Sequence, residues 1–590
     1  MRAIANAVRK ACLALALLWA PPALAQSEKP NIVVILIDDA ALMDLGVYGG
    51  EAATPNIDAL AAQGAYFTQY RTSPLCSPTR AMLLTGMDNH LTGVATIPEV
   101  LPEEHVGQPG YSMHLEEGVL TLADHLRASG YRTLMTGKWH LGEEAAQMPH
   151  NHGFDRSFAL AASGADNWED KSYMPYYTDA PWYEDGEATG LPEDFYSSEF
   201  IVDQMIDYLG NTDQNQPFFA YLPFQAIHIP VQAPQEFIDK YKGRYDEGWH
   251  ALREARFEKA QELGLIARGV PLAPMPDDAR RWESLTEEDR AVYAARMEVN
   301  AAMMDAMDHH IGRFIEHLKE NGEYENTVFV VTSDNGPEFN RGDNDGRLAF
   351  WMWLNGYHVD LEGLGQEGSW GFIGPEWANA AASPGALFKF YATEGGIRAP
   401  LIMAGPGISQ MTVDSPAMVT DVAPTLLALA DVDPLSNAEK SMTGRSLVPV
   451  LSGEQDSVYG EQDIRAIEVS GNSALYLGDY KIVRSVPPVG DGEWKLFNMV
   501  LDPGESQDLS DALPDVKAIL LEAYNGYAEE MGVLEMPEGY NSLEQILENT
   551  LKRQKEKYGW LLIPFLIMLA GVLIGLWLII RSIFRKRVKA

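Results

Sequence analysis

Cysteine is almost absent from this sequence. Its 590 residues include only Cys12 and Cys76, and Cys12 lies in an N-terminal segment with the features of a cleaved signal peptide. The mature chain would then keep Cys76 alone, which excludes an intramolecular disulfide. A single cysteine in an exported protein indicates special chemistry at that residue, although a lone buried cysteine also serves commonly as a small hydrophobic side chain.

Basic residues are scarce as well. Lysine and arginine number 44 against 84 aspartates and glutamates, which gives a formal net charge of −40. This excludes nucleic acid as a partner, because its binding requires clustered Lys and Arg. A cationic pocket can still lie inside an acidic protein, so an anionic small molecule is not excluded. A content of 46% hydrophobic and 22% charged residues is typical of a globular protein, and the length favours more than one domain.

The N-terminal segment has the pattern of a secretory signal. Three basic residues precede an apolar run at 11–20, and an Ala-Leu-Ala sequence follows it. This pattern predicts a signal peptide over 1–25, with the mature chain starting at Gln26. An uncleaved membrane anchor is disfavoured because the apolar run is short.

A second apolar segment lies near the C-terminus. Residues 560–580 carry no charge and are numerous enough to span a bilayer, so they predict a transmembrane helix. The basic tail at 581–590 places that end in the cytoplasm. We therefore expect an exported protein anchored by its C-terminal helix, with its main domain on the periplasmic or extracytoplasmic side.

The region 26–440 has the pattern of a single α/β domain. Continuous apolar, β-branched runs at 31–37, 217–222 and 327–332 predict strands buried on both faces of a sheet. Helical patterns, for example at 121–129 and 299–321, lie between them. The alternation predicts a large, mostly parallel central sheet flanked by helices.

The pattern changes after about residue 440. Four short strand-like runs, at 466–470, 473–477, 480–486 and 493–498, predict a small antiparallel sheet. We assign them to a C-terminal α+β subdomain at 441–540, in which a helix at 515–531 packs on the sheet. Residues 541–559 predict a charged helical stalk that leads to the membrane span. The glycine-rich stretch 355–374 predicts a long loop, a candidate lid.

The residues that follow Cys76 favour an anion site. Ser77 is suited to an N-cap and Pro78 to the first helical position, so a helix is expected to begin just after Cys76. The positive end of that helix would face any group that Cys76 holds. Arg80 adds a cation one turn later, and a thiol in this setting is expected to be acidic and reactive. These features together predict a nucleophile that faces an anionic substrate.

Two motifs make a family resemblance specific. The stretch C-S-P-T-R at 76–80, followed by a helix and Thr85-Gly86, resembles the signature of the formylglycine-dependent sulfatases. The stretch G-Y-R-T-L-M-T-G-K-W-H at 130–140 is similar to the second signature of that family. The resemblance covers Pro30 to about residue 510 and is closest to bacterial arylsulfatases.

The resemblance implies an alkaline-phosphatase-like fold and a sulfuric ester hydrolase. Its expected reaction splits sulfate esters, aryl sulfates in particular, into an alcohol or phenol and inorganic sulfate. It also implies that a formylglycine-generating enzyme oxidises Cys76 to formylglycine (3-oxoalanine) during maturation. A phosphonate or phosphate ester hydrolase of the same superfamily is the main alternative, because these esters are similar tetrahedral anions. A catalytically inactive ectodomain is disfavoured because Cys76, Arg80, Lys138 and His228 are all present.

By the same resemblance, two acidic pairs are metal ligands. Asp38 and Asp39 follow the first predicted strand, and Asp334 and Asn335 follow another within S-D-N-G. With an oxygen from the modified Cys76 they form an all-oxygen site, which hard cations prefer. The resemblance implies Ca²⁺, while the donor chemistry also allows Mg²⁺ or Mn²⁺. Acidic pairs after strands are commonly caps or turns, but two pairs at matching strand ends favour a metal.

The remaining catalytic candidates lie in family-like blocks. They are Lys138 and His140 in the second signature, His228 in A-I-H-I-P, and Lys389 just before T-E-G-G-I-R-A-P at 393–400. In the implied mechanism, Arg80 and the metal activate the formylglycine hydrate, which attacks sulfur while Lys138 and Lys389 hold the sulfate oxygens. His228, assisted by Lys389, protonates the leaving group, and His140 deprotonates the second hydroxyl.

The sequence leaves the histidine roles, the pocket wall and the natural substrate undetermined. The division of acid and base roles between His140 and His228 is not fixed by any residue pattern. Trp351, Trp353 and Trp370 are candidates for the wall of a substrate pocket, although aromatic residues of this kind are more often part of a core. The natural substrate is not specified.

Overall fold

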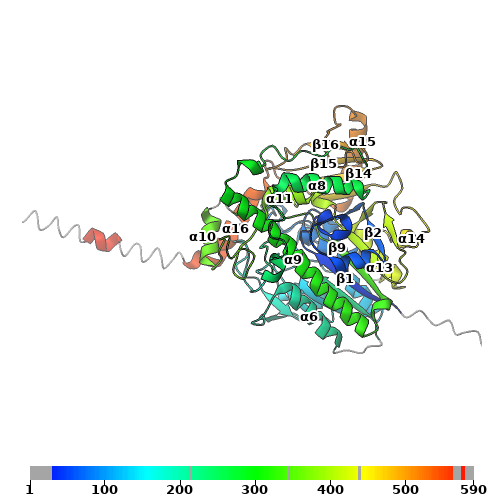
Figure 1. Ribbon diagram of the computed structural model, residues 1–590, viewed down its shortest axis with the longest axis horizontal. Coiled ribbons are helices and arrows are strands. Elements are labelled where there is room, and N and C mark those ends of the chain that lie inside the picture. The colour runs from blue at the N-terminus through cyan, green and yellow to red at the C-terminus, as the bar shows by residue number, and fades with distance from the viewer. Residues whose placement is uncertain (1–28, 211–215, 343–345, 436–439, 562–572, 579–590) are drawn as a thin grey trace, which may run out of the picture.

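A computed structural model describes residues 29–210, 216–342, 346–435, 440–561 and 573–578 (Figure 1). Its main element is a ten-stranded sheet with the strand order β11-β2-β10-β9-β1-β8-β4-β5-β6-β7. The strands in that order are Met411–Val413, Ala65–Phe67, Leu401–Ala404, Thr327–Ser333, Asn31–Ile37, Phe218–Pro223, Arg132–Lys138, Arg156–Leu160, Trp182–Glu184 and Glu187–Thr189. The five central strands, from β9 to β5, are parallel, as the sequence predicts.

The antiparallel pairings towards the edges were not predicted. Strand β10 runs antiparallel to β9, and β6 runs antiparallel to β5. Strands β6 and β7 are three residues long each, and such short strands carry no distinct sequence pattern. The α/β class with a large central sheet is nevertheless confirmed.

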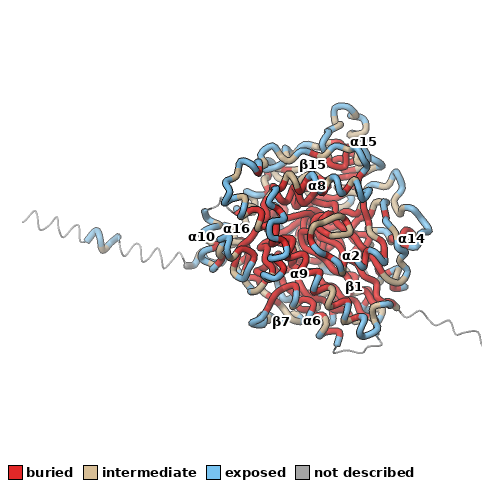
Figure 2. Tube along the Cα trace, in the orientation of Figure 1, coloured by how far each residue is buried: buried red, intermediate tan, exposed pale blue. Residues whose placement is uncertain are grey.

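Strand β1 divides the two cores of the domain. Val33, Ile35 and Ile37 point into one core, while Ile32, Val34 and Leu36 point into the other, because successive side chains of a strand alternate between faces. The first core includes residues of α6 (Ser197–Gly210) and α9 (Glu287–Glu320), and the second includes residues of α3, α5 and α13 (Cys76–Thr85, Leu122–Ala128 and Val422–Leu429). Helices thus cover both faces of the sheet, and its centre is buried (Figure 2).

Further short elements surround this frame. The helices are α2 Pro55–Ala61, α4 Asn89–Thr92, α7 Gln235–Ile238, α8 Gly248–Glu262, α10 Gly346–Leu354, α11 Gly374–Ala381, α12 Glu394–Ile397 and α14 Val448–Leu451. Strands β3 (Tyr70–Arg71) and β12 (Ala417–Met418) form a separate pair. The long helix α9 begins at Glu287, twelve residues before the predicted start at 299, because Thr286 caps it by accepting from the backbone N–H of Asp289.

The predicted small antiparallel sheet is confirmed. Strands β13 to β16 (Arg465–Val469, Asn472–Leu477, Tyr480–Arg484 and Trp494–Asn498) pair in sequence order. Helix α15 (Pro514–Met531) packs on them through a cluster that includes Leu520 and Tyr524. Glu394 of the T-E-G-G block joins this sheet to the main domain, since its carboxylate lies 2.9 Å from Arg71 and 3.1 Å from Lys481.

Helix α16 (Ser542–Tyr558) differs from the predicted stalk. It lies against the main domain, where Arg553 pairs with Glu143 at 2.5 Å and Lys557 with Asp179 at 3.1 Å. The Asn549 side chain also donates to the backbone carbonyls of Pro98, Glu99 and Leu101. The charge that suggested a solvated stalk therefore anchors the helix.

The prediction of a transmembrane helix at 560–580 is not supported. In the part of the chain that the structure describes, no helix combines the length and the apolar character needed to cross a membrane. Residues 562–572 and 579–590, which include most of that segment and the basic tail, lie outside the described part, as does the signal peptide at 1–25. The predicted membrane anchoring and the location built on it are corrected accordingly.

A buried histidine links the main domain to β13 and predicts a pH-dependent stability. The His90 ring lies 2.9 Å from Asp88 and 2.7 Å from Glu468. Burial alone would lower the pKa of His90, but its bonds to the two carboxylates outweigh burial and raise it to about 9. The stabilisation is therefore complete below pH 6.5 and is lost as pH rises to about 9, which amounts to about 3 kcal/mol at most.

We expect the melting temperature to fall between pH 6.5 and 9, and to fall less steeply in a His90→Gln variant. Thermal melts in buffers across this range check the expectation. Parallel pH profiles for the two proteins would show that His90 does not carry the effect.

Candidate active site

The carboxyl ends of β1 and β9 place the two predicted acidic pairs side by side. Strand β1 pairs with β9 up to Ile37 and Ser333, so Asp38-Asp39 and Asp334-Asn335 leave the sheet at the same edge. All four side chains are at most 1% exposed. The backbone N–H of Asp39 donates to Asp334 Oδ1 at 3.1 Å, and Asn335 Nδ2 donates to Asp39 Oδ1 at 2.6 Å. These two hydrogen bonds connect the loop after β1 to the loop after β9.

This cluster fits a metal ion. One potential ligand atom from each of Asp38, Asp39, Cys76 and Asp334 lies within 4.8 Å of the others. Among the described residues, the buried Oδ1 atoms of Asp38 and Asn335 have no hydrogen-bond partner. Burial, with the neighbouring carboxylates, raises the pKa of Asp38 to about 6 and that of Asp39 to about 8. A hard divalent cation would stabilise both ionised groups and use the two free oxygens.

Cys76 is the first residue of helix α3, so the helix begins two positions earlier than the predicted first helical residue, Pro78. Leu75 occupies the N-cap position, and the Ser77 hydroxyl donates to the His140 carbonyl at 2.6 Å instead of capping the helix. Cys76 is 3% exposed, and its sulfur lies 3.8 Å from Asp39 Oδ1.

The expectation of an acidic thiol is wrong. Burial raises the pKa of Cys76 well above its usual value, and the charge of Asp334 adds to the effect. Lys138 and Lys389 oppose the rise without cancelling it. The unmodified thiol would therefore carry little thiolate at neutral pH and would be a weak nucleophile.

Three buried cations balance the carboxylates. Arg80 donates twice to Asp334 Oδ2, from Nε at 3.1 Å and from Nη2 at 2.8 Å. Lys138, the last residue of β4, lies 2.5 Å from Asp38. Lys389 lies 2.9 Å from Asp39 and 3.0 Å from Glu338. The site thus brings three cationic side chains against four carboxylates, all shielded from water.

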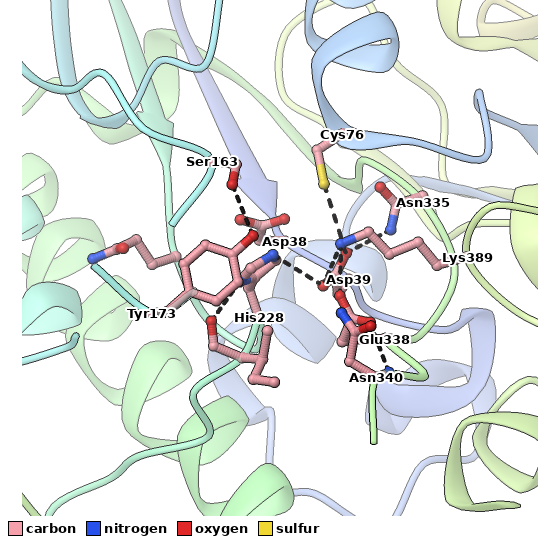
Figure 3. A network of polar contacts seen from close by, with 12 residues as sticks. Asp38, Asp39, Cys76, Ser163, Tyr173, His228, Asn335, Glu338, Asn340 and Lys389 are labelled. Carbon is pink, nitrogen blue, oxygen red and sulfur yellow. Dashed lines mark hydrogen bonds and ion pairs between the residues drawn. The ribbon is translucent and has the colours of Figure 1, made fainter. Parts of the chain in front are cut away.

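His228 faces this charged cluster (Figure 3), and His140 lines the same cavity beside Cys76. His228 Nδ1 is 2.6 Å from the Ile229 carbonyl, so it carries the proton of the neutral ring, while Nε2 lies 3.8 Å from Asp39 Oδ2. Burial and the charges of Lys389 and Lys138 lower the pKa of His228 well below its usual value. Burial and Lys138 do the same for His140, whose two ring nitrogens have no hydrogen-bond partner within the described chain.

The sequence did not identify Glu338, Tyr173 or Ser163. Glu338 pairs with Lys389 and lies two positions after the end of the S-D-N-G stretch, so its closeness to that stretch was an available signal. Tyr173 packs edge-on against His228, with ring centroids 4.9 Å apart, and its hydroxyl is 2.8 Å from Ser163 Oγ. These two residues lie in loops without a recognisable pattern, and only the fold brings them to the site.

The cluster opens into a cavity of about 460 Å³. Cys76, His140, His228 and Lys389 line one end, and residues of α10 and α16 line the walls. Trp351 and Trp370 belong to the lining, as suggested, whereas Trp353 does not and is 70% exposed. A second cavity of about 920 Å³ lies beside it and shares Asn340, Arg341 and Leu543, but none of the predicted catalytic residues lines it.

Comparison with known proteins relates this arrangement to a family. Residues 30–432 match the family model described as Sulfatase. An uncharacterized sulfatase of Schizosaccharomyces pombe is 36% identical over 540 residues, which cover 88% of this chain and 96% of that protein. An arylsulfatase of Klebsiella aerogenes is 37% identical over 438 residues, which cover 72% of this chain and 91% of that protein.

Solved structures support the fold. One structure, in complex with its substrate D-glucosamine-2-N,6-O-disulfate, superposes with a TM-score of 0.57 at 21% identity. The superposition covers 87% of this chain and 100% of that chain. At this identity the likeness shows a shared fold and no more.

Proposed function

This chain belongs to the sulfatase family of sulfuric ester hydrolases, and we propose that it cleaves sulfate monoesters, aryl sulfates among them, at the buried cluster around Cys76. The observation that carries the proposal is the meeting of Cys76, three cations and four carboxylates at one end of a cavity. The alternative of a phosphonate or phosphate ester hydrolase is not favoured, since the family model and the curated relatives are sulfatases.

Cys76 is proposed to act after oxidation to formylglycine. Its thiol is a weak nucleophile in this setting because its pKa is raised well above the usual value by burial. The hydrate of an aldehyde at the same position would offer hydroxyl oxygens to the substrate instead. Since Cys76 is only 3% exposed, a formylglycine-generating enzyme would have to reach it before the chain folds.

We further propose that Asp38, Asp39, Asp334, Asn335 and an oxygen of the modified Cys76 hold a divalent cation, Ca²⁺ in the first instance. When bound, such an ion supplies positive charge that stabilises the sulfate oxygens. Three cations against four carboxylates leave one negative charge when all are ionised, and a divalent ion converts it to one positive charge. That sign suits a sulfate monoester, which carries one negative charge.

Side chains of the protein are proposed to position the nucleophile, bind the sulfate oxygens and transfer the protons. Arg80 holds Asp334 and orients the helix that bears Cys76, while Lys138 and Lys389 are placed to donate to sulfate oxygens. The negative charge of a bound substrate favours protonation of His228 at Nε2, from which a proton passes to the leaving oxygen with support from Lys389. His140, with both ring nitrogens free among the described residues, accepts the proton of the second hydroxyl as sulfate departs.

Mass spectrometry of the tryptic peptide that contains Cys76 tests the modification. Conversion of the thiol to the aldehyde lowers the peptide mass by about 18 Da relative to unmodified cysteine. We expect this shift in active protein, and its fraction should scale with specific activity across preparations. An intact thiol in fully active protein would rule out formylglycine as the nucleophile.

A further inference from the structure

One face of helix α16 forms a wall of the active-site cavity. Six of its residues line the cavity: Leu543, Ile546, Leu547, Thr550, Leu551 and Gln554. Their spacing of three and four residues places them on one side of an α-helix. Four of the six are aliphatic, so the helix presents an apolar stripe to the cavity that leads to Cys76.

Protein atoms leave this stripe partly uncovered. Leu543, Leu547 and Leu551 are 43%, 36% and 58% exposed. The orientation of the helix is nevertheless fixed, because Asn549, Arg553 and Lys557 bind the main domain from its other positions. A helix held firmly with an uncovered apolar face indicates that an apolar group covers the face at some stage of function.

Other parts of the cavity lining are also apolar. Leu348 and Trp351 of α10 line the cavity, together with Ile97, Met174 and Phe390. At the outer side of α10, Phe350, Trp353 and Leu354 are 62%, 70% and 66% exposed, and the rings of Phe350 and Trp353 stack at 5.8 Å. Both helices lie on the same side of the molecule (Figure 1). The apolar surface thus runs from the cavity to the outside of α10.

Several polar groups that line the cavity are already engaged. Arg341 binds Glu376 at 2.5 Å, Glu338 binds Lys389 at 3.0 Å, and Gln554 donates to the Pro175 carbonyl at 2.6 Å. A sugar would need several hydrogen-bond partners along such a wall, whereas a hydrocarbon needs none. The volume of about 460 Å³ is in the range that holds a ligand much larger than the sulfate group.

We propose that the preferred substrate is an amphiphilic sulfate monoester whose apolar chain or ring system lies between α10 and α16, with its sulfate at Cys76. The proposal rests on the proposed sulfate ester hydrolysis and names the leaving group that this cavity selects. Leu547 and Leu551 would then determine specificity by contacting the hydrocarbon, away from the reacting atoms.

A series of n-alkyl sulfates tests the proposal with the full-length protein. From butyl to octyl sulfate, the basicity of the leaving alcohol hardly changes, so differences in kcat/KM report contact with the chain. We expect a gain of about threefold per methylene, close to the limit for burying a methylene, or about 80-fold over the series. The gain should come mainly from KM, because chain contacts are the same in the ground and transition states.

A double variant, Leu547→Gln with Leu551→Gln, keeps a similar side-chain size and helix propensity but makes the wall polar. It should reduce the gain per methylene to below about 1.5-fold, with a far smaller loss on p-nitrophenyl sulfate. The matched control is Glu548→Gln with Lys555→Gln, on the same helix but outside the cavity lining, and it should keep the wild-type slope.

Binding of n-alkyl sulfonates, which have no cleavable ester oxygen, gives a second readout by calorimetry. A tightening of Kd with chain length supports the proposal whether or not turnover is measured. Flat profiles of both kcat/KM and Kd, or an unchanged slope in the Leu547/Leu551 variant, would overturn it. A dimer that hides the stripe, seen by sedimentation together with flat profiles, would also overturn it. Loss of all sulfate ester turnover would instead contradict the proposed function.

Discussion

Replacement of Cys76 by alanine is expected to lower kcat/KM for p-nitrophenyl sulfate by at least about 10⁴-fold, because it removes the residue that forms the attacking group. The fold should persist. Within the described part of the chain, the Cys76 sulfur makes one hydrogen bond, a long contact of 3.8 Å with Asp39. The ion pairs of Arg80, Lys138 and Lys389 do not involve it. Steady-state kinetics and thermal melts of the same preparation measure the two effects.

Thr85→Ala is a matched control for this experiment. Thr85 lies at the other end of helix α3, is 1% exposed, and its hydroxyl donates to the Ala81 carbonyl within the helix. Its loss should change the melting temperature about as much as Cys76→Ala while leaving kcat/KM within about threefold of wild type. Retention of near-wild-type hydrolysis by Cys76→Ala would assign the nucleophile to another residue.

The meeting of the two acidic pairs could be predicted because each pair directly follows a strand that the local sequence pattern identifies. Asp38 and Asp334 directly follow buried apolar strands, and parallel neighbouring strands end at the same edge of a sheet. A strand pattern and the next two residues therefore suffice to bring the acidic pairs together. Lys138 was identified differently, from its place in the second family-like motif, and the structure shows it as the last residue of β4.

Properties that arise between distant segments could not be predicted. The thiol of Cys76 has a raised pKa because the folded chain buries it beside Asp334, about 250 residues away. From the sequence alone, the helix start behind Cys76 predicted the opposite direction. Burial of a charge outweighs a helix terminus because the terminus offsets only a small part of the cost of removing water.

Helix α16 is a second such case. Its charged residues suit a solvated stalk equally well, and only their partners decide between the two arrangements. Arg553 pairs with Glu143, and Lys552 pairs with Glu103, in segments more than 400 residues earlier in the chain. Because these ion pairs hold α16 against the main domain, the helix lines the cavity instead of serving as a spacer. The substrate we propose is therefore one with an apolar group that contacts α16.

The Asp334→Asn variant is expected to lose at least about 10³-fold in kcat/KM and to lose stabilisation by Ca²⁺. In the wild type, a bound ion should raise the melting temperature of chelator-treated protein, because it binds the folded state alone. Asparagine has nearly the same volume but removes one negative charge from the four groups that could hold the ion. It also leaves Arg80 buried without its closest counterion, which costs about 3–5 kcal/mol of stability.

That general loss of stability has to be separated from a loss of ion binding, and Asp421→Asn provides the comparison. Asp421 is also fully buried and accepts hydrogen bonds from the backbone N–H groups of Met418 and Arg445, but it is not among the groups that could hold a metal. Its variant should melt at a lower temperature yet keep the upward shift on addition of Ca²⁺. If Asp334→Asn kept that shift or full activity, Asp334 would be a structural partner of Arg80 and not a metal ligand.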